Sequence, residues 1–138
     1  MSKRLLLTVL LFAMSFGIAR ANEQAKKEAV EAANVWLALI DQGDFADSWE
    51  NAASLFKGAV KKEQWQQQMN AGRKPLGGLV SRSVKSTHYA TSLPGAPDGE
   101  YVVIQYQTSF ENKRSAVETV TPMKDKDGSW HVSGYFIK

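Results

Sequence analysis

Hydrophobic residues first recur at helical spacing between positions 23 and 42. One face of this segment carries Ala29, Ala33, Trp36, Leu37 and Ile40, and Val35 and Leu39 widen the stripe. The opposite face carries Lys27, Glu31, Asn34 and Asp41. This pattern is typical of an amphipathic helix that packs on a core. Gly43 follows and favours the left-handed conformation that ends a helix, so we predict a helix over residues 23–42.

Two further helices are predicted before residue 75. Asp44 is a favourable N-cap residue, and Gly58 ends the segment that it begins. The apolar face of that segment consists of Phe45, Trp49, Ala52, Ala53 and Phe56. A third helix is expected over residues 61–71, with Trp65 and Met69 turned inward, before Gly72 and Pro75 stop it.

After Gly78 the apolar residues follow a period of two, which indicates strands. We expect four strands, over residues 79–91, 101–110, 115–123 and 130–137. The intervening turns are predicted at residues 93–99, 111–113 and 125–128. Helices followed by such a meander predict an α+β domain, with three N-terminal helices packed on one face of a four-stranded antiparallel sheet.

Alternation divides the predicted strands into two faces. We assign the helix-covered core face to Val102, Ile104, Tyr106, Phe110, Trp130, Val132 and Phe136. The other face then carries Tyr101, Val103, Gln105, Gln107, His131, Tyr135 and Ile137. An open sheet face needs no aromatic or branched side chains. Its apolar members therefore predict either an interface or the wall of a pocket.

The first 21 residues have the three parts of a secretory signal peptide. Lys3 and Arg4 precede an apolar run over residues 5–18, and small residues occupy positions 19 and 21. The run of 14 residues is shorter than the roughly 20 that a membrane span requires. We expect cleavage after Ala21, a periplasmic or secreted protein with no membrane span, and one domain over residues 22–138.

Removal of this segment changes the net charge of the chain. Cleavage removes Lys3, Arg4 and Arg20, which are three of the 17 basic residues, and none of the 14 acidic ones. The net charge of +3 therefore belongs to the signal peptide, and we expect no nucleic-acid partner. The chain has no cysteine, so packing rather than disulfide bonds must stabilise the domain.

Several short segments carry a family resemblance when taken in order. They are Trp36-Leu37, Ser48-Trp49, Trp65, Arg73, Pro75-Leu76-Gly77, Leu93-Pro94-Gly95, Pro97-Asp98-Gly99-Glu100-Tyr101, Glu118, Asp127-Gly128-Ser129-Trp130 and Gly134-Tyr135-Phe136-Ile137. Together they resemble DUF4019, a family of secreted bacterial proteins of unknown function. The resemblance implies a cystatin-like or NTF2-like domain whose concave sheet face often forms a pocket or a dimer surface, and it implies no catalytic residues.

The sequence lacks the residue patterns of nucleophilic catalysis, metal binding and phosphate loops. His88 and His131 are the two imidazole bases, and no glycine-flanked nucleophile turn surrounds a serine. There is no cysteine and no histidine pair at ligand spacing, so we expect no metal site and no cofactor. Gly77-Gly78 lacks the lysine of a phosphate loop, and turn formation accounts for it.

Glu118 is the charged residue with the strongest case for a role, because it falls in the middle of a predicted strand, where a buried carboxylate needs a partner. In a pocket it would serve as a general acid or base; otherwise it forms a cross-strand ion pair. Arg82 is close enough in the predicted sheet to pair with it, or to hold an anionic ligand. Arg82, Gln105, Glu118 and Tyr135 form the predicted ligand-binding set.

Two functions follow from these features. The first is a non-enzymatic module that binds a protein or small molecule, or a second copy of itself, through the open sheet face or a shallow aromatic pocket. The alternative is a small NTF2-like enzyme with Glu118 as general acid or base. Convergence of the four residues on a cavity would favour the enzyme.

Overall fold

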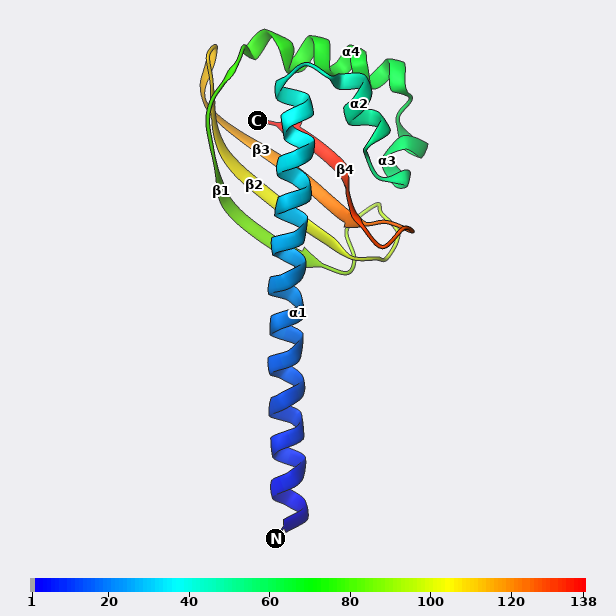
Figure 1. Ribbon diagram of the computed structural model, residues 1–138, viewed down its shortest axis with the longest axis vertical. Helices are drawn as coiled ribbons and strands as arrows, with labels where there is room; N and C mark the ends of the chain where they lie inside the picture. Colours follow the sequence, from blue (N-terminus) through cyan, green and yellow to red (C-terminus); the bar gives the residue numbers. More distant parts are fainter. Residues whose placement is uncertain (1) are drawn as a thin grey trace.

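A computed structural model describes the backbone of residues 2–138 and the side chains of residues 16–138. The helical half contains α1 (Ser2–Asp41), α2 (Phe45–Glu50), α3 (Ser54–Ala59), α4 (Lys62–Gly72) and the 3-10 helix η1 (Lys74–Leu76). The sheet half contains β1 (Leu79–Ala90), β2 (Tyr101–Phe110), β3 (Lys113–Lys124) and β4 (Trp130–Ile137). Helices precede the sheet along the chain, which confirms the predicted α+β fold (Figure 1).

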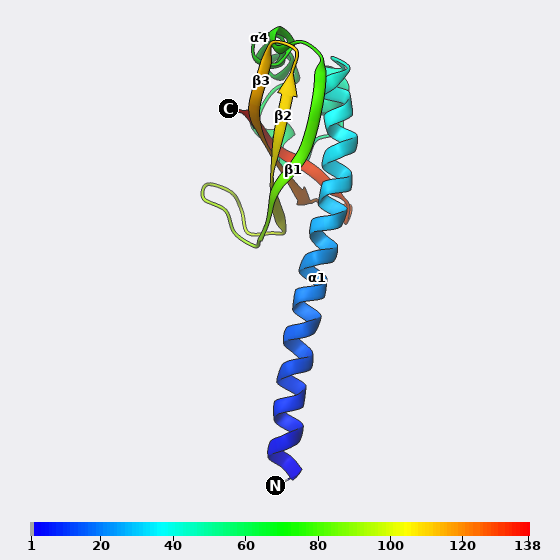
Figure 2. The same ribbon diagram turned by 90° about the vertical axis from the view of Figure 1, so that its left-hand side faces the viewer.

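The four strands form one antiparallel sheet in the order β1-β2-β3-β4. Viewed from the edge, α1 lies along one face of the sheet, α4 lies at one end, and the β1–β2 connection stands off the other side (Figure 2). The predicted meander is therefore correct, including the short hairpin turn between Phe110 and Lys113.

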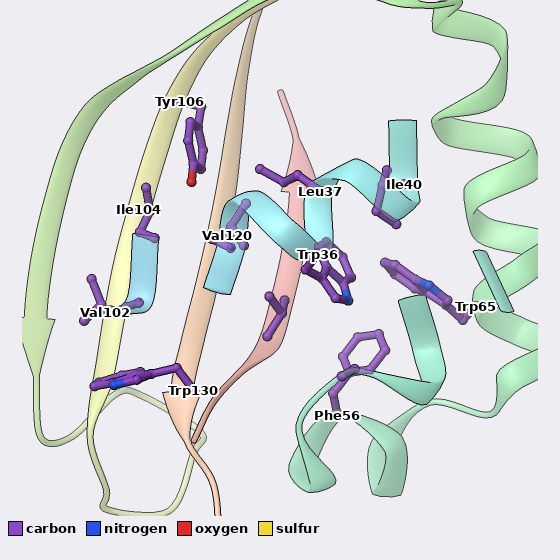
Figure 3. Close-up of a cluster of buried hydrophobic side chains, with 14 of the residues drawn as sticks. Trp36, Leu37, Ile40, Phe56, Trp65, Val102, Ile104, Tyr106, Val120 and Trp130 are labelled. Carbon is purple, nitrogen blue, oxygen red and sulfur yellow. The ribbon is translucent and has the colours of Figure 1, made fainter. Parts of the chain in front are cut away.

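The core lies between α1 and the sheet, as the helix-face assignment of β2 predicted. Val102, Ile104 and Tyr106 from β2 pack with Val120 and Val132 from the next two strands (Figure 3). Helix α1 contributes Ala29, Ala33, Trp36, Leu37 and Ile40 to the same cluster. The alanines let the helix approach the sheet closely, and the larger residues fill the space toward its C-terminal end.

Three tryptophans are fixed in this region by their indole N–H groups. Trp36 Nε1 donates to the backbone oxygen of Ser48 at 2.8 Å, and Trp65 Nε1 donates to Ser48 Oγ at 2.9 Å. Trp49 Nε1 donates to the backbone oxygen of Val60 at 2.8 Å. A buried indole needs such a partner. The first two bonds join α1, α2 and α4 around the buried Ser48, and the third ties α2 to the link between α3 and α4.

The helix expected over residues 44–58 is divided into α2 and α3. Ala53 between them is extended, and its N–H donates to the backbone oxygen of Val132 in β4 at 2.8 Å. Asp125 in the β3–β4 turn then caps α3, since its Oδ2 accepts from Ser54 N at 2.7 Å and Ser54 Oγ at 3.0 Å. Asp44, the expected cap, makes no side-chain capping hydrogen bond. Contacts with distant residues decide this break, so helical periodicity alone did not reveal it.

Helix α1 continues without interruption through the predicted signal peptide. Side chains before residue 16 lie outside the described ones, so the peptide stays a prediction. Within the part of the chain that the structure describes, no helix is long and apolar enough to cross a membrane. At its other end α1 stops as predicted, because Gly43 adopts a positive φ of 78°.

Candidate functional site

An extra residue in β4 determines which side chains reach the site. Pro122 of β3 pairs with Val132, but Thr121 pairs with Gly134, which leaves Ser133 as a bulge. A bulge of one residue reverses the alternation of the side chains that follow. Tyr135 therefore lies on the helix-covered face, and Phe136 points away from it with 59% of its surface exposed. The prediction that placed Tyr135 on the open face and Phe136 in the core is wrong for this reason.

The other face of the sheet is more polar than the alternation predicted. It carries Ser83, Gln105, Gln107, Thr119 and Thr121, whose register partners share that face. Tyr101 is on this side but buried, because the β1–β2 connection covers it and its hydroxyl donates to the backbone oxygen of Pro97 at 2.6 Å. Ile137 pairs with Glu118 on the helix side. The expected apolar patch of Tyr101, Val103, Tyr135 and Ile137 is therefore absent from the described open face.

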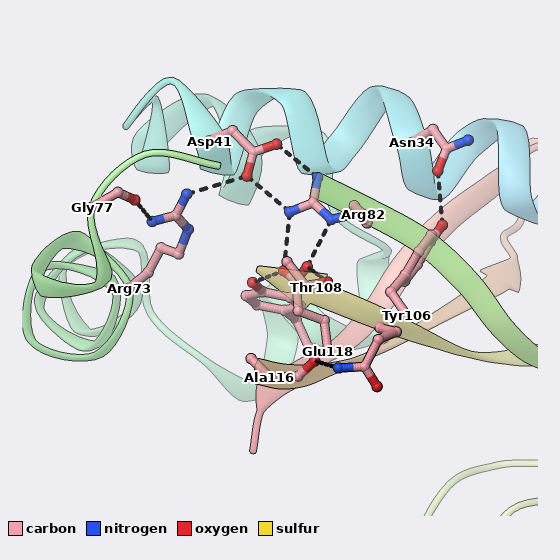
Figure 4. Close-up of polar contacts among 11 residues, drawn as sticks. Asn34, Asp41, Arg73, Gly77, Arg82, Tyr106, Thr108, Ala116 and Glu118 are labelled. Carbon is pink, nitrogen blue, oxygen red and sulfur yellow. Dashed lines mark hydrogen bonds and ion pairs between the residues drawn. The ribbon is translucent and has the colours of Figure 1, made fainter. Parts of the chain in front are cut away.

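On the helix side, four charged residues form a buried ion network: Asp41, Arg73, Arg82 and Glu118 (Figure 4). Arg82 lies between the two carboxylates. Its Nε donates to Glu118 Oε1 at 2.7 Å, and its Nη1 donates to Asp41 Oδ2 at 2.8 Å. Its Nη2 is shared, at 2.9 Å from Asp41 Oδ1 and 3.2 Å from Glu118 Oε2. The planar fork of arginine suits this double engagement.

Glu118 has 0% of its surface exposed, and hydrogen bonds engage both of its oxygens. Oε1 accepts from Thr108 Oγ1 at 2.6 Å as well as from Arg82, and Oε2 accepts from the Tyr135 hydroxyl as well as from Arg82. A carboxylate has about four lone-pair positions. All of them are used within the protein, so none is left for a substrate.

Arg73 connects the network to the turn before the sheet. It is 3% exposed, and its Nη2 donates to Asp41 Oδ1 at 3.3 Å while its Nη1 donates to the backbone oxygen of Gly77 at 2.6 Å. Its guanidinium also lies 4.3 Å from the centre of the Phe110 ring. Gly77 has a φ of 78°, and a Cβ there would lie 3.0 Å from Glu111 Cβ. The predicted role in a turn is thus sufficient to account for Gly77-Gly78.

Ionisation in the network follows from burial and pairing. Burial disfavours the charged form of Arg82, but hydrogen bonds to Asp41 and Glu118 outweigh it and raise the pKa of the guanidinium. Burial raises the pKa of the Tyr135 hydroxyl far above its ordinary value, and the charge of Glu118 adds to this effect. Burial also raises the pKa of Tyr106 to about 12. Two arginines thus face two carboxylates, so the formal charges of the network balance, and the Tyr135 hydroxyl that joins it stays protonated.

The predicted ligand-binding set is only partly brought together. Arg82, Glu118 and Tyr135 meet in the network, whereas Gln105 lies on the opposite face, where its Oε1 is 3.4 Å from Ser86 Oγ. Asp41 and Arg73 complete the network. Asp41 lies on the polar face of the predicted first helix and Arg73 follows the predicted third helix, so neither position by itself indicates an ion pair. Arg82 and Glu118 lie on β1 and β3, the two strands that flank β2, and their predicted pairing was the one part of the network that the sequence indicated.

A cavity of about 550 Å³ lies beside Tyr135, between α3–α4 and the β1–β2 connection. We call it the aromatic groove and define it by Leu55, Phe56, Trp65, Tyr101, Tyr135 and Phe136. The ring of Trp65 packs edge-on against the ring of Phe56, with 4.9 Å between their centroids, and its centroid lies 6.5 Å from that of Tyr135. Leu55 and Phe136 were not predicted to form a site, because the break before α3 and the bulge in β4 place them there.

The two histidines make no catalytic arrangement. His131 Nε2 is 2.9 Å from Asp127 Oδ2, and its Nδ1 is 3.2 Å from the backbone oxygen of Asn51, so it links the β3–β4 hairpin to the end of α2. His88 is exposed on β1. Among the described residues, no group of three histidine, aspartate or glutamate side chains is placed to hold a metal ion.

Comparison with known families gives one match. The model of the family described as a protein of unknown function, DUF4019, matches residues 32–135. The chain therefore belongs to the DUF4019 family. No curated protein matches the chain.

Proposed function

We propose that this member of the DUF4019 family is a secreted, non-enzymatic module that binds an apolar segment of a partner protein in the aromatic groove. The observation that carries the proposal is the exposure of large apolar side chains on both walls of this groove. Leu55 is 38% exposed and Phe136 is 59% exposed. Adjacent exposed apolar residues of this kind mark interaction sites.

The shape of the groove favours a protein over a small molecule. A small ligand is usually buried over most of its surface by its pocket. Here the floor of Trp65 and Tyr135 is buried or half-buried, but the rim residues Leu55 and Phe136 extend the apolar surface beyond the cavity. A partner segment that inserts one side chain and covers the rim would use both parts of this surface.

The ion network argues against the alternative of an enzyme with Glu118 as general acid or base. A catalytic carboxylate must reach the proton that it transfers. Glu118 is instead enclosed, and its hydrogen-bond partners are Arg82, Thr108 and Tyr135.

The order of helices before a four-stranded antiparallel sheet supports the cystatin-like or NTF2-like assignment, which is part of the proposal.

Secretion with cleavage after Ala21 completes the proposal. Among the described side chains of α1, the first buried one is Ala25, so cleavage there would leave the part of the helix that packs on the sheet. We expect the exported protein to begin at Asn22, and intact-mass spectrometry of the periplasmic or extracellular fraction checks this. An exported protein that retains residues 1–21 would contradict this part of the proposal.

Photo-cross-linking in the producing cell tests the groove. A benzophenone amino acid is placed at Phe136 or Leu55, with Val80 as the control because it is 64% exposed and lies on β1, away from the groove. We expect the same discrete cross-linked partner from both groove positions and none from Val80. Absence of a product at both groove positions, or the same product at Val80, would contradict the proposal. A product of twice the chain mass would assign the groove to a second copy of the chain instead.

A further inference from the structure

A second cavity, of about 740 Å³, lies between α1 and the β3–β4 hairpin and shares no lining residue with the aromatic groove. Its α1 wall is formed by Glu28, Glu31, Ala32, Val35 and Leu39, and the hairpin contributes Trp130 and His131. We call this cavity the α1 cleft. Positions 28, 32, 35 and 39 follow one another at steps of three or four residues and Glu31 adjoins Ala32, so they form a second stripe on the helix beside the one that packs on the sheet.

The floor of the α1 cleft is apolar, and part of it is left exposed by the fold. Val35 is 72% exposed, although Ala33, Trp36 and Leu37 beside it on the same helix are buried. Trp130 forms part of the opposite wall, and its indole N–H donates to Glu28 Oε2 at 3.2 Å. This bond holds the tryptophan, which is 9% exposed and otherwise packs in the core, at the wall of the cleft.

The titratable residues that line the α1 cleft are Glu28, Glu31 and His131. Its lining includes the carboxylates of Glu28 and Glu31 and, within the described part of the chain, no lysine or arginine. Hydrogen bonds from Gln24 and Trp130, with a smaller effect of Lys124, lower the pKa of Glu28, so it is ionised at neutral pH. Glu31 is exposed and makes no ion pair with the described side chains. An apolar floor under an acidic rim is complementary to a segment that is apolar on one side and basic on the other.

We infer that the α1 cleft binds a basic amphipathic peptide segment of a partner protein, with an apolar side chain between Val35 and Trp130 and lysine or arginine beside Glu28 and Glu31. The α1 wall runs from residue 28 to residue 39, which is about 16 Å at the rise of an α-helix. That length accommodates about three turns of a helical segment lying along the cleft, which is a common mode of recognition.

A matched pair of peptides tests this inference. One is a labelled 12-residue peptide with leucine on one helical face and lysine on the other, and the second has glutamate in place of lysine. Binding to the protein is measured by fluorescence anisotropy at pH 8, where His131 is less protonated than at neutral pH, at low and high salt. We expect the lysine peptide to bind at least about tenfold more tightly at low salt, and this preference to shrink as salt screens the rim.

Charge reversal in the protein makes the test specific. Glu31→Lys should weaken the lysine peptide about tenfold and strengthen the glutamate peptide, whereas Glu23→Lys, on the same helix but outside the cleft, should change neither by more than about twofold. Both positions are exposed, and circular dichroism confirms that the variants fold. Equal binding of the two peptides, or equal effects of the two variants, would overturn the inference. A dimer of the unmodified protein that Glu31→Lys dissociates would assign the cleft to a second copy and overturn it as well.

Discussion

The buried ion network and the aromatic groove meet at Tyr135, but they differ in what they leave free. The hydroxyl of Tyr135 donates to Glu118, inside a network in which charges balance and the carboxylate oxygens are occupied. The ring of the same residue lines the groove, where Leu55 and Phe136 remain exposed. Glu118 thus has no free oxygen, whereas the groove that we propose as the binding surface presents exposed apolar side chains.

The network should respond most strongly to loss of Arg82. Arg82→Met leaves Glu118 buried without its cation and removes one of the two cations of Asp41. Breaking a buried ion pair by removing one partner typically costs about 3–5 kcal/mol. We expect the free energy of unfolding to fall by that amount, measured by urea unfolding with tryptophan fluorescence.

Arg114→Met is the control for this substitution, because Arg114 is exposed on β3 and an exposed substitution usually changes stability by less than about 0.5 kcal/mol. If the two variants unfold at the same urea concentration, the network does not stabilise the domain, and the contrast between a structural network and a functional groove fails.

Glu118→Gln should have the next largest effect on stability. Arg82 keeps its two hydrogen bonds to Asp41, so the cation is not left alone, but the charge-assisted bonds to Glu118 are lost. Such bonds contribute about 1.5–3 kcal/mol, and we expect a loss in this range in the same urea assay. A carboxylate kept for catalysis often lowers stability, so a variant more stable than the parent would instead favour the enzyme.

The sequence predicted the fold because the fold depends mainly on local patterns. The period-two segments after Gly78 and the helical stripe over residues 23–42 were correct, and so was the core face of β2. The site was harder to predict, because one inserted residue decides it. Ser133 has no feature that marks a bulge, yet the bulge moves Tyr135 into the helix-covered face and Phe136 out of it. Likewise, the hydrogen bond from Ala53 to Val132 that separates α2 from α3 joins residues far apart in the sequence.

The shared residue allows the two regions to be separated. Tyr135→Phe removes the hydroxyl from the network but keeps the ring in the groove, so it should lower stability by about 1 kcal/mol without changing cross-linking from a probe at Leu55. Phe136→Ser should do the reverse, with a change in unfolding free energy below about 0.5 kcal/mol and loss of the Leu55 product. If either variant alters both properties to the same extent, the network and the groove are not independent.

The smallest expected effect concerns His131, which lies in neither region and fastens the hairpin to the end of α2. Burial lowers the pKa of His131, but bonds to Asp127 and to the Asn51 backbone outweigh it, and the pKa is raised. A raised pKa in the folded state stabilises the protein fully below the unfolded value of about 6.5, and this contribution is lost as the pH rises through the folded value. The melting temperature of the parent should therefore exceed that of His131→Gln at pH 5.5 by more than at pH 8.5. The effect should be a few tenths of a kcal/mol, as for other exposed pairs. His88→Gln, on exposed β1, should show no such pH dependence relative to the parent; an equal dependence in both variants would mean that the pair with Asp127 does not hold the hairpin in place.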